Sequence, residues 1–106
     1  MDPIKNCENL EKRIVKTFLP MNPEKIILFG SHAHGNADQY SDIDIIIVYQ
    51  TNKRFLDRLE ELYAQWDINC ATDILAYTPE EFDAMLKENS FIKEVVDTGR
   101  IIYESA

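Results

Sequence analysis

The sequence has few cysteines, no long apolar run and no apolar leader. Its two cysteines, Cys7 and Cys70, lie far apart and outside any Cys-x-x-Cys spacing, so they form neither a zinc motif nor a disulfide framework. Reduced thiols of this kind favour a cytoplasmic location. Apolar runs such as Ile43 to Tyr49 are too short to span a membrane, and the polar first residues lack a signal core. We therefore expect a cytoplasmic protein that does not contact membranes.

Basic residues are also scarce. Lysine and arginine number 11 against 19 aspartates and glutamates, which gives a formal net charge of -8. An acidic surface repels phosphate backbones, so direct binding to nucleic acid is disfavoured. The acidity suits a site for divalent cations, although solubility alone is the more ordinary reason for an acidic surface.

What the chain does contain is a regular succession of helix and strand patterns. Its 106 residues, 45% of them hydrophobic, predict a single domain over residues 1–106, without repeats or linkers. Apolar spacings of three and four residues predict helices, and β-branched runs predict strands. The predicted helices cover residues 4–19, 53–66, 79–87 and 91–97, and the predicted strands cover residues 25–29, 43–49, 71–77 and 100–103.

Two details refine this pattern. Thr78, Pro79 and Glu81 form a helix start in which threonine is the N-cap and glutamate completes a capping box. The strands at 25–29 and 43–49 are close in sequence and lack a crossover helix, which favours a mixed sheet over a fully parallel one. The expected fold class is α/β (α+β), with about four strands in a mixed β-sheet and helices packed on it.

The helix at 53–66 carries an apolar stripe. Phe55, Leu59, Leu62 and Trp66 recur at helical spacing along it. We interpret this stripe as part of the core, not as a binding surface.

Three aspartates lie in or beside predicted strands. Asp42 and Asp44 flank Ile43 at the start of a very apolar strand, and side chains two residues apart point to the same side of a strand. Asp73 lies inside the strand at 71–77, a position where aspartate is unfavourable. If these strands are neighbours, the three carboxylates can face one cleft. Such oxygen ligands suit two Mg²⁺ ions, with Mn²⁺ as an alternative.

A Gly-Ser pair follows the strand at 25–29. Gly30 lets the backbone approach a phosphate closely, and Ser31 with the following amides can donate hydrogen bonds to it. Each of these motifs is weak alone, since most Gly-Ser pairs are turns and most Asp-x-Asp pairs are solvated. The ordered set at strand boundaries is far more specific.

The set resembles the hallmark of the DNA polymerase beta nucleotidyltransferase superfamily. The matching stretches are Leu28 to Gly35, Ser41 to Ile45, and Thr72 to Leu75. The short chain resembles the minimal nucleotidyltransferases within it, which often serve as antitoxins to HEPN-domain toxins. The resemblance implies a palm-like sheet, with Asp42, Asp44 and Asp73 as catalytic metal ligands.

The resemblance also implies a reaction. Gly30 and Ser31 would bind the phosphates of an NTP, most often ATP, and AMP would pass to a tyrosine hydroxyl of a HEPN-type partner. Where relatives often carry arginines in the Gly-Ser loop, this chain has His32 and His34, which removes fixed positive charge. We interpret both histidines as ordinary loop residues more readily than as catalytic groups.

Two other functions stay open. The chain could be a non-catalytic antitoxin that acts by contact alone, or a transferase for a small-molecule acceptor. A palm without further subdomains is also expected to leave apolar surface exposed, which a partner or a homo-oligomer would cover. Metal-dependent NTP binding would separate the enzymes from the binding module.

Overall fold

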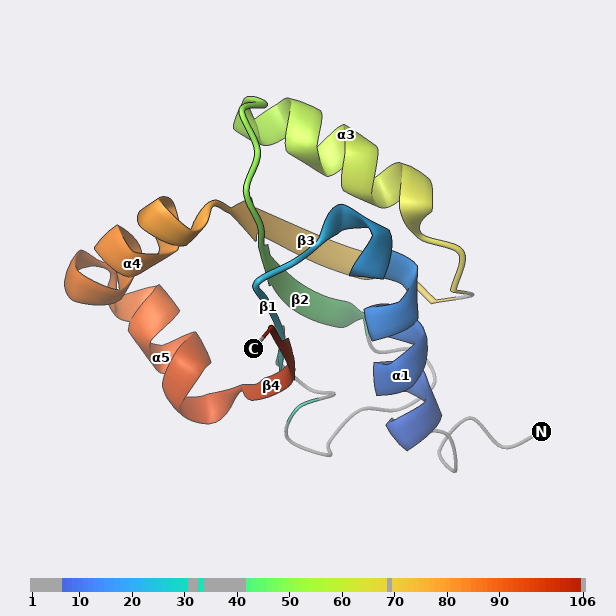
Figure 1. Ribbon diagram of the computed structural model, residues 1–106. Helices are drawn as coiled ribbons and strands as arrows, with labels where there is room; N and C mark the ends of the chain where they lie inside the picture. The colour runs from blue at the N-terminus through green and yellow to red at the C-terminus, as the bar shows by residue number, and fades with distance from the viewer. Residues whose placement is uncertain (1–6, 31–32, 34–41, 69, 106) are drawn as a thin grey trace.

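The computed structural model describes residues 7–30, 33, 42–68 and 70–105 (Figure 1). Its elements follow the order expected from the sequence, with one added 3-10 turn, η2, after the first helix. They are α1 (Cys7–Phe18), η2 (Leu19–Met21), β1 (Lys25–Phe29), β2 (Ile43–Val48), α3 (Phe55–Gln65), β3 (Thr72–Tyr77), α4 (Pro79–Glu88), α5 (Ser90–Thr98) and β4 (Arg100–Glu104). Within these residues, no helix has the length and apolarity needed to cross a membrane.

The sheet is mixed, as predicted. Its strand order is β3-β2-β1-β4, in which β1 runs antiparallel to both β2 and β4, while β2 and β3 are parallel. The connection between β1 and β2 joins two antiparallel strands, whereas α3 supplies the crossover that returns β3 parallel to β2. The sheet order therefore follows from where the helices fall in the sequence.

Helices cover both faces of this sheet (Figure 1). Alternate strand residues form two apolar cores, because successive side chains of a strand point to opposite faces. On one face, α1 and α3 pack on the first core, which includes Ile14, Phe18, Ile26, Leu28, Ile43, Ile45, Ile47, Leu62, Ile74 and Ala76. On the other face, α4 and α5 pack on the second core, which consists of Ile27, Ile46, Val48, Phe82, Ile92 and Val95.

The predicted apolar stripe of α3 is wrong at one position. Leu62 is fully buried and Leu59 and Trp66 are partly buried, but Phe55 is 37% exposed. Its ring lies 6.0 Å from the ring of Tyr77, at the surface. Helical spacing alone could not show this, because the first turn of α3 extends past the core.

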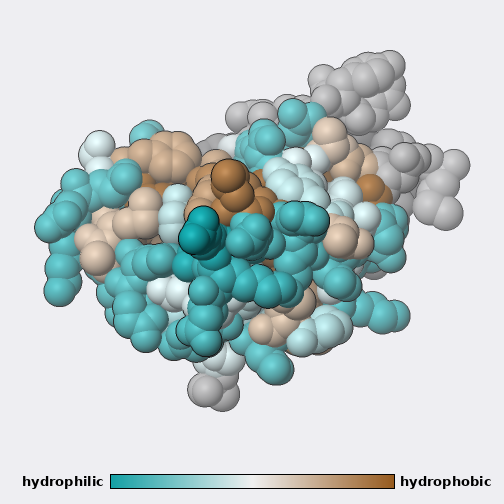
Figure 2. Space-filling view, turned by 90° about the horizontal axis from the view of Figure 1, so that it is seen from above, coloured by the Kyte–Doolittle hydropathy of each residue, from teal (hydrophilic) through white to brown (hydrophobic). Residues whose placement is uncertain are grey.

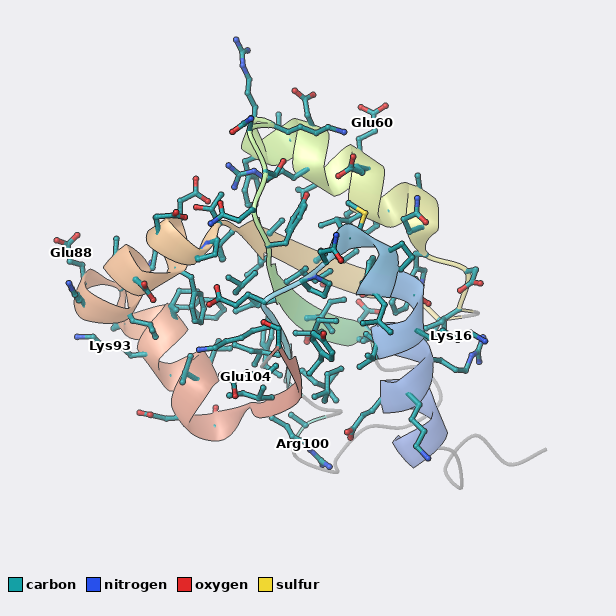
Figure 3. All side chains as sticks on the ribbon, viewed as in Figure 1. Lys16, Glu60, Glu88, Lys93, Arg100 and Glu104 are labelled. Atoms are coloured by element: carbon teal, nitrogen blue, oxygen red, sulfur yellow. The ribbon has the colours of Figure 1, made fainter. Side chains whose placement is uncertain are left out.

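Apolar surface does remain exposed, as expected for this chain. Leu56 is 76% exposed on α3, and Tyr63 on the same helix is 40% exposed. Seen from the α3 side, an apolar patch stands out within a mostly hydrophilic surface (Figure 2). Charged side chains such as Glu60, Glu88 and Lys93 point outward around the molecule (Figure 3).

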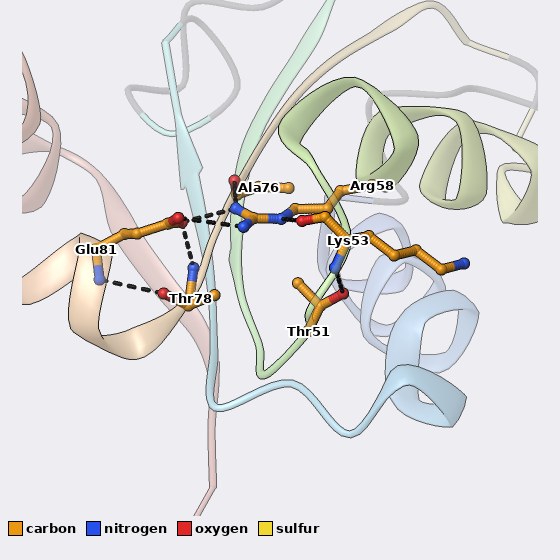
Figure 4. A network of polar contacts seen from close by, with 6 residues as sticks. All are labelled: Thr51, Lys53, Arg58, Ala76, Thr78 and Glu81. Atoms are coloured by element: carbon orange, nitrogen blue, oxygen red, sulfur yellow. Dashed lines mark hydrogen bonds and ion pairs between the residues drawn. The ribbon is translucent and has the colours of Figure 1, made fainter.

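Arg58 joins three elements through one guanidinium group (Figure 4). Although Arg58 is only 7% exposed, each of its three side-chain nitrogens donates to an acceptor. Its Nη1 and Nη2 donate to the two carboxylate oxygens of Glu81 at 2.6 and 3.1 Å, and Nη1 also donates to the carbonyl of Ala76 at 3.3 Å. Its Nε donates to the carbonyl of Lys53 at 2.8 Å. A bidentate pair of this kind fixes α3, β3 and α4 together.

Glu81 has a second role at the start of α4. It accepts a hydrogen bond from the amide of Thr78 at 2.9 Å, and the Thr78 hydroxyl accepts from the Glu81 amide at 3.2 Å, so the predicted capping box is confirmed. The hydrogen bond from Arg58, followed by the amide of Thr78, holds the pKa of Glu81 below its ordinary value. The helix start and the Arg58 contact therefore share one carboxylate.

Side chains from α3 also close the free edge of β3. Because β3 pairs with β2 on one side only, its outer backbone groups need other partners. The Tyr63 hydroxyl accepts from the amide of Ile74 at 3.0 Å, and Arg58 donates to the carbonyl of Ala76. This edge is therefore capped by side chains and not by another strand.

We predict that Arg58→Met lowers the free energy of unfolding by about 2 kcal/mol, because Glu81 and the Ala76 carbonyl lose a charged donor. Chemical denaturation would measure this loss. Arg54→Met is the matched control, since Arg54 is exposed at the start of the same helix. Equal stability of the two variants would contradict the structural role of Arg58.

The shared carboxylate also predicts a pH effect. A lowered pKa means that Glu81 stabilises the fold above its unfolded pKa, near 4.5, and that this contribution is lost as pH falls through the folded value. Between about pH 5 and about pH 3, the wild type should therefore lose melting temperature more steeply than Glu81→Gln. Glu88→Gln, at the other end of α4, should follow the wild-type curve; parallel curves for all three proteins would refute the linkage.

Candidate functional site

The candidate residues meet at one end of the sheet, where β1 ends and β2 and β3 begin. Gly30 follows β1, Asp42 precedes β2, Asp44 is the second residue of β2 and Asp73 the second residue of β3. The remaining nucleotide-binding candidate, Ser31, lies outside the described residues. The same holds for His32 and His34 and for the rest of the predicted loop except Ala33.

Asp44 and Asp73 are neighbours across the sheet. The parallel pairing of β2 and β3 places them directly beside each other, on strands about 4.8 Å apart. They share the α4 and α5 face, because Ile46 and Leu75, two residues further along each strand, both belong to the second core. Asp73 therefore lies beside Asp44 and faces the same side of the sheet, as expected if the two strands were neighbours.

Asp42 belongs to the same end of the sheet. It directly precedes β2, two residues before Asp44, and it is exposed. The loop before β3 lies next to it, since the amide of Ile43 donates to the carbonyl of Ala71 at 2.9 Å. Burial, followed by the charge of Asp42, raises the pKa of the Cys70 thiol, so this thiol is a poor nucleophile. We assign Cys70 no chemical role.

Gly30 approaches the Asp44 carboxylate closely. Its φ of +74° lies in the left-handed region that favours glycine. A Cβ at this position would lie 2.4 Å from Oδ2 of Asp44 and 3.3 Å from its Cγ. The carbonyl of Gly30 accepts a hydrogen bond from the amide of Ala33 at 3.1 Å, which closes a tight turn. The backbone and the carboxylate thus form a narrow corner that no other residue type would allow.

The donor set fits a hard divalent cation. Carboxylates are the ligands that Mg²⁺ takes together with substrate phosphates, and here two of them come from adjacent strands. Within the described residues, however, no group of three or more His, Cys, Asp or Glu side chains is arranged closely enough to hold a metal ion. The assignment of Asp42, Asp44 and Asp73 as metal ligands therefore stays a prediction.

Comparison with known proteins identifies the family. A family model described as "Polymerase beta, Nucleotidyltransferase" matches residues 11–106. The chain belongs to this family. It is therefore a nucleotidyltransferase, as its motifs predicted.

Individual relatives of this nucleotidyltransferase agree with that result. A "Probable protein adenylyltransferase MntA" of Haemophilus influenzae is 36% identical over 84 residues, which cover 74% of each chain. The fold matches a "putative nucleotidyltransferase" of Sulfolobus solfataricus, with a TM-score of 0.62, 19% identity and coverage of 95% of this chain and 82% of that one. It also matches a toxin–antitoxin solved with AMP-PNP, with a TM-score of 0.61, 24% identity and coverage of 90% and 73%.

Sequence reasoning missed the side chains that hold the acidic strands in place. The Tyr63 hydroxyl contacts the residue after Asp73, and the Thr72 hydroxyl donates to the carbonyl of Ile43 at 2.9 Å, which ties the starts of β2 and β3 together. No periodic signal marks these residues, because their partners become neighbours only in the folded sheet.

A hollow of about 330 Å³ on α4 is lined by Ala84, Met85, Glu88 and Asn89, and none of the three aspartates lines it.

We predict that Gly30→Ala costs about 1–3 kcal/mol of stability, from the left-handed backbone and the contact with Asp44. A thermodynamic cycle separates the two causes. In an Asp44→Ala background the cost should fall by about 1 kcal/mol, whereas an Asp97→Ala background should leave it unchanged. The same cost in both backgrounds would show that the Asp44 carboxylate does not determine the need for glycine.

Proposed function

We propose that this nucleotidyltransferase transfers AMP from ATP to a hydroxyl of a partner protein, and that the partner is a HEPN-type toxin which the transfer inactivates. The relative from Haemophilus influenzae supports protein adenylylation through its printed name. The similar toxin–antitoxin with AMP-PNP supports an adenine nucleotide and a toxin partner.

The observation that carries the proposal is the corner formed by Gly30, Asp44 and Asp73. Two carboxylates lie side by side on parallel strands, and a glycine backbone approaches one of them without an intervening Cβ. A triphosphate could bind here only together with cations, because its negative charge would otherwise meet two aspartates. The site therefore suits a metal-bound nucleotide better than a free anion.

In the proposed reaction, the residues of the chain position the cations and the nucleotide. Asp42 and Asp44 would hold cations at the start of β2 and Asp73 would hold them from β3, while the backbone at Gly30 would approach the phosphates. Two bound Mg²⁺ ions would neutralise the triphosphate and lower the pKa of the attacking hydroxyl. The acceptor oxygen bonds to the α-phosphorus as the bond between the α-phosphorus and the bridging oxygen breaks, and pyrophosphate leaves. Asp73, which is exposed, can accept the hydroxyl proton.

Incubation with ATP labelled at the α-phosphate tests the proposal. The partner to test is the protein encoded by a neighbouring gene. Label should appear on this partner, and its appearance should require both Mg²⁺ and the nucleotidyltransferase. Tight binding of the partner without label from any NTP would instead support an antitoxin that acts by contact alone. Label on an aminoglycoside-like small molecule would support the third function.

We predict that Asp44→Asn lowers the rate of transfer at least 1,000-fold, since the substitution removes one charged ligand from the centre of the site. Asp83→Asn, an exposed aspartate on α4, is the matched control and should transfer at the wild-type rate. Unfolding curves would confirm that both variants fold. Undiminished transfer by Asp44→Asn would refute the metal assignment.

A further inference from the structure

Two phenylalanine rings meet beside the acidic end of the sheet. Phe29 is the last residue of β1, and Phe91 lies in the first turn of α5. Their ring centroids are 6.0 Å apart, and the ring planes meet at 83°, an edge-to-face contact. Two segments far apart in sequence thus place one aromatic pair next to the site.

The pair continues the row of acids across the sheet. Phe29 is the register partner of Asp44, and both share the α4 and α5 face, since Phe29 packs on the second core. Asp44 in turn is the register partner of Asp73. On this face Phe29, Asp44 and Asp73 therefore follow one another across the sheet, and Phe91 contacts Phe29 from α5.

The two rings differ in solvent exposure. Phe29 is partly buried against the second core, whereas Phe91 is 49% exposed. The buried residues of α5 are Ile92 and Val95, so the helix packs on the second core chiefly through these two side chains. A half-exposed ring that rests on a second ring offers a free aromatic surface at little conformational cost.

The spacing matches one molecule of nucleotide. Phe29 and Asp44 lie on strands about 4.8 Å apart, and the Phe91 ring lies 6.0 Å from the Phe29 ring, so Phe91 lies within roughly 10 Å of Asp44. A nucleoside triphosphate spans such a distance between its base and its terminal phosphates. Every base has a π-face that can stack on an aromatic side chain, and purines have the larger one.

We infer that Phe91, supported by Phe29, stacks on the purine base of the nucleotide whose phosphates bind at Gly30 and the aspartates. The inference rests on the proposed nucleotide site and adds its base subsite. Stacking discriminates between bases by the size of the ring system and not by the hydrogen-bonding groups at its edge. The enzyme should therefore bind ATP and GTP with similar affinity, and CTP and UTP more weakly.

The test is calorimetric binding of a non-hydrolysable ATP analogue, and of inorganic tripolyphosphate, in the presence of Mg²⁺. Phe91→Leu keeps an apolar side chain against Phe29 but removes the stacking surface. It should weaken the ATP analogue about tenfold and leave tripolyphosphate unchanged, and Phe91→Trp should restore the affinity. Phe55→Leu is the matched control, because Phe55 is also a half-exposed ring paired with an aromatic, at the opposite ends of β2 and β3.

The outcomes separate this inference from the proposed function. Equal ATP affinity in Phe91→Leu and the wild type, with tripolyphosphate still bound, would overturn the base subsite alone. An equal loss for both ligands would also overturn it, since the effect would then concern the phosphates or the fold. Failure of the wild type to bind either ligand would overturn the nucleotide site and the subsite together.

Discussion

The parallel pairing of β2 with β3 is the constraint on which the rest of this structure depends. The pairing is in register from the first residue of each strand, so Asp44 and Asp73 become neighbours. A slip of one residue would turn Asp73 to the opposite face and bring an apolar residue in its place. Side chains of α3 also help to hold this register, in addition to the hydrogen bonds between the two strands. Arg58 and Tyr63 bind backbone groups on the free edge of β3, and Arg58 also fixes the start of α4 through Glu81.

The repulsion between the two carboxylates destabilises the sheet, and other interactions of the sheet must offset it. Like charges directly opposite each other on neighbouring strands are destabilising, and Asp44 and Asp73 are such a pair. The same strands bury a row of isoleucines, which contribute about 1.5–3 kcal/mol each. The second core ends where the acids begin, so one face of the sheet is apolar under α4 and α5 and charged beyond them. A cation at the charged end would remove the repulsion without altering the core.

Most of the fold could be predicted because its signals are local. Helical and strand periodicity, the Thr78 capping box and the short β1–β2 connection all depend on residues close in sequence. The acidic pair followed from strand alternation, and only its closeness to Asp73 required the sheet order. The buried Arg58 could not be predicted, because an arginine on a helix is ordinarily solvated and its partners lie 18 and 23 residues away. The sequence predicted that Gly30 lets the backbone approach a phosphate. The structure shows that glycine is already required here because a Cβ would clash with the Asp44 carboxylate.

The position of the acids also differs from that of ligands in parallel α/β sheets, which bind beyond the carboxyl ends of the strands. Here the acids lie at the amino ends of β2 and β3. The antiparallel β1 explains the difference, since it brings its carboxyl end, and with it the turn at Gly30, to the same place. The crossover through α3 packs on the first core, on the face of the sheet opposite to Asp44 and Asp73. A mixed sheet thus combines a backbone turn that favours phosphate with carboxylates that favour cations, and a purely parallel sheet would place these two features at opposite ends.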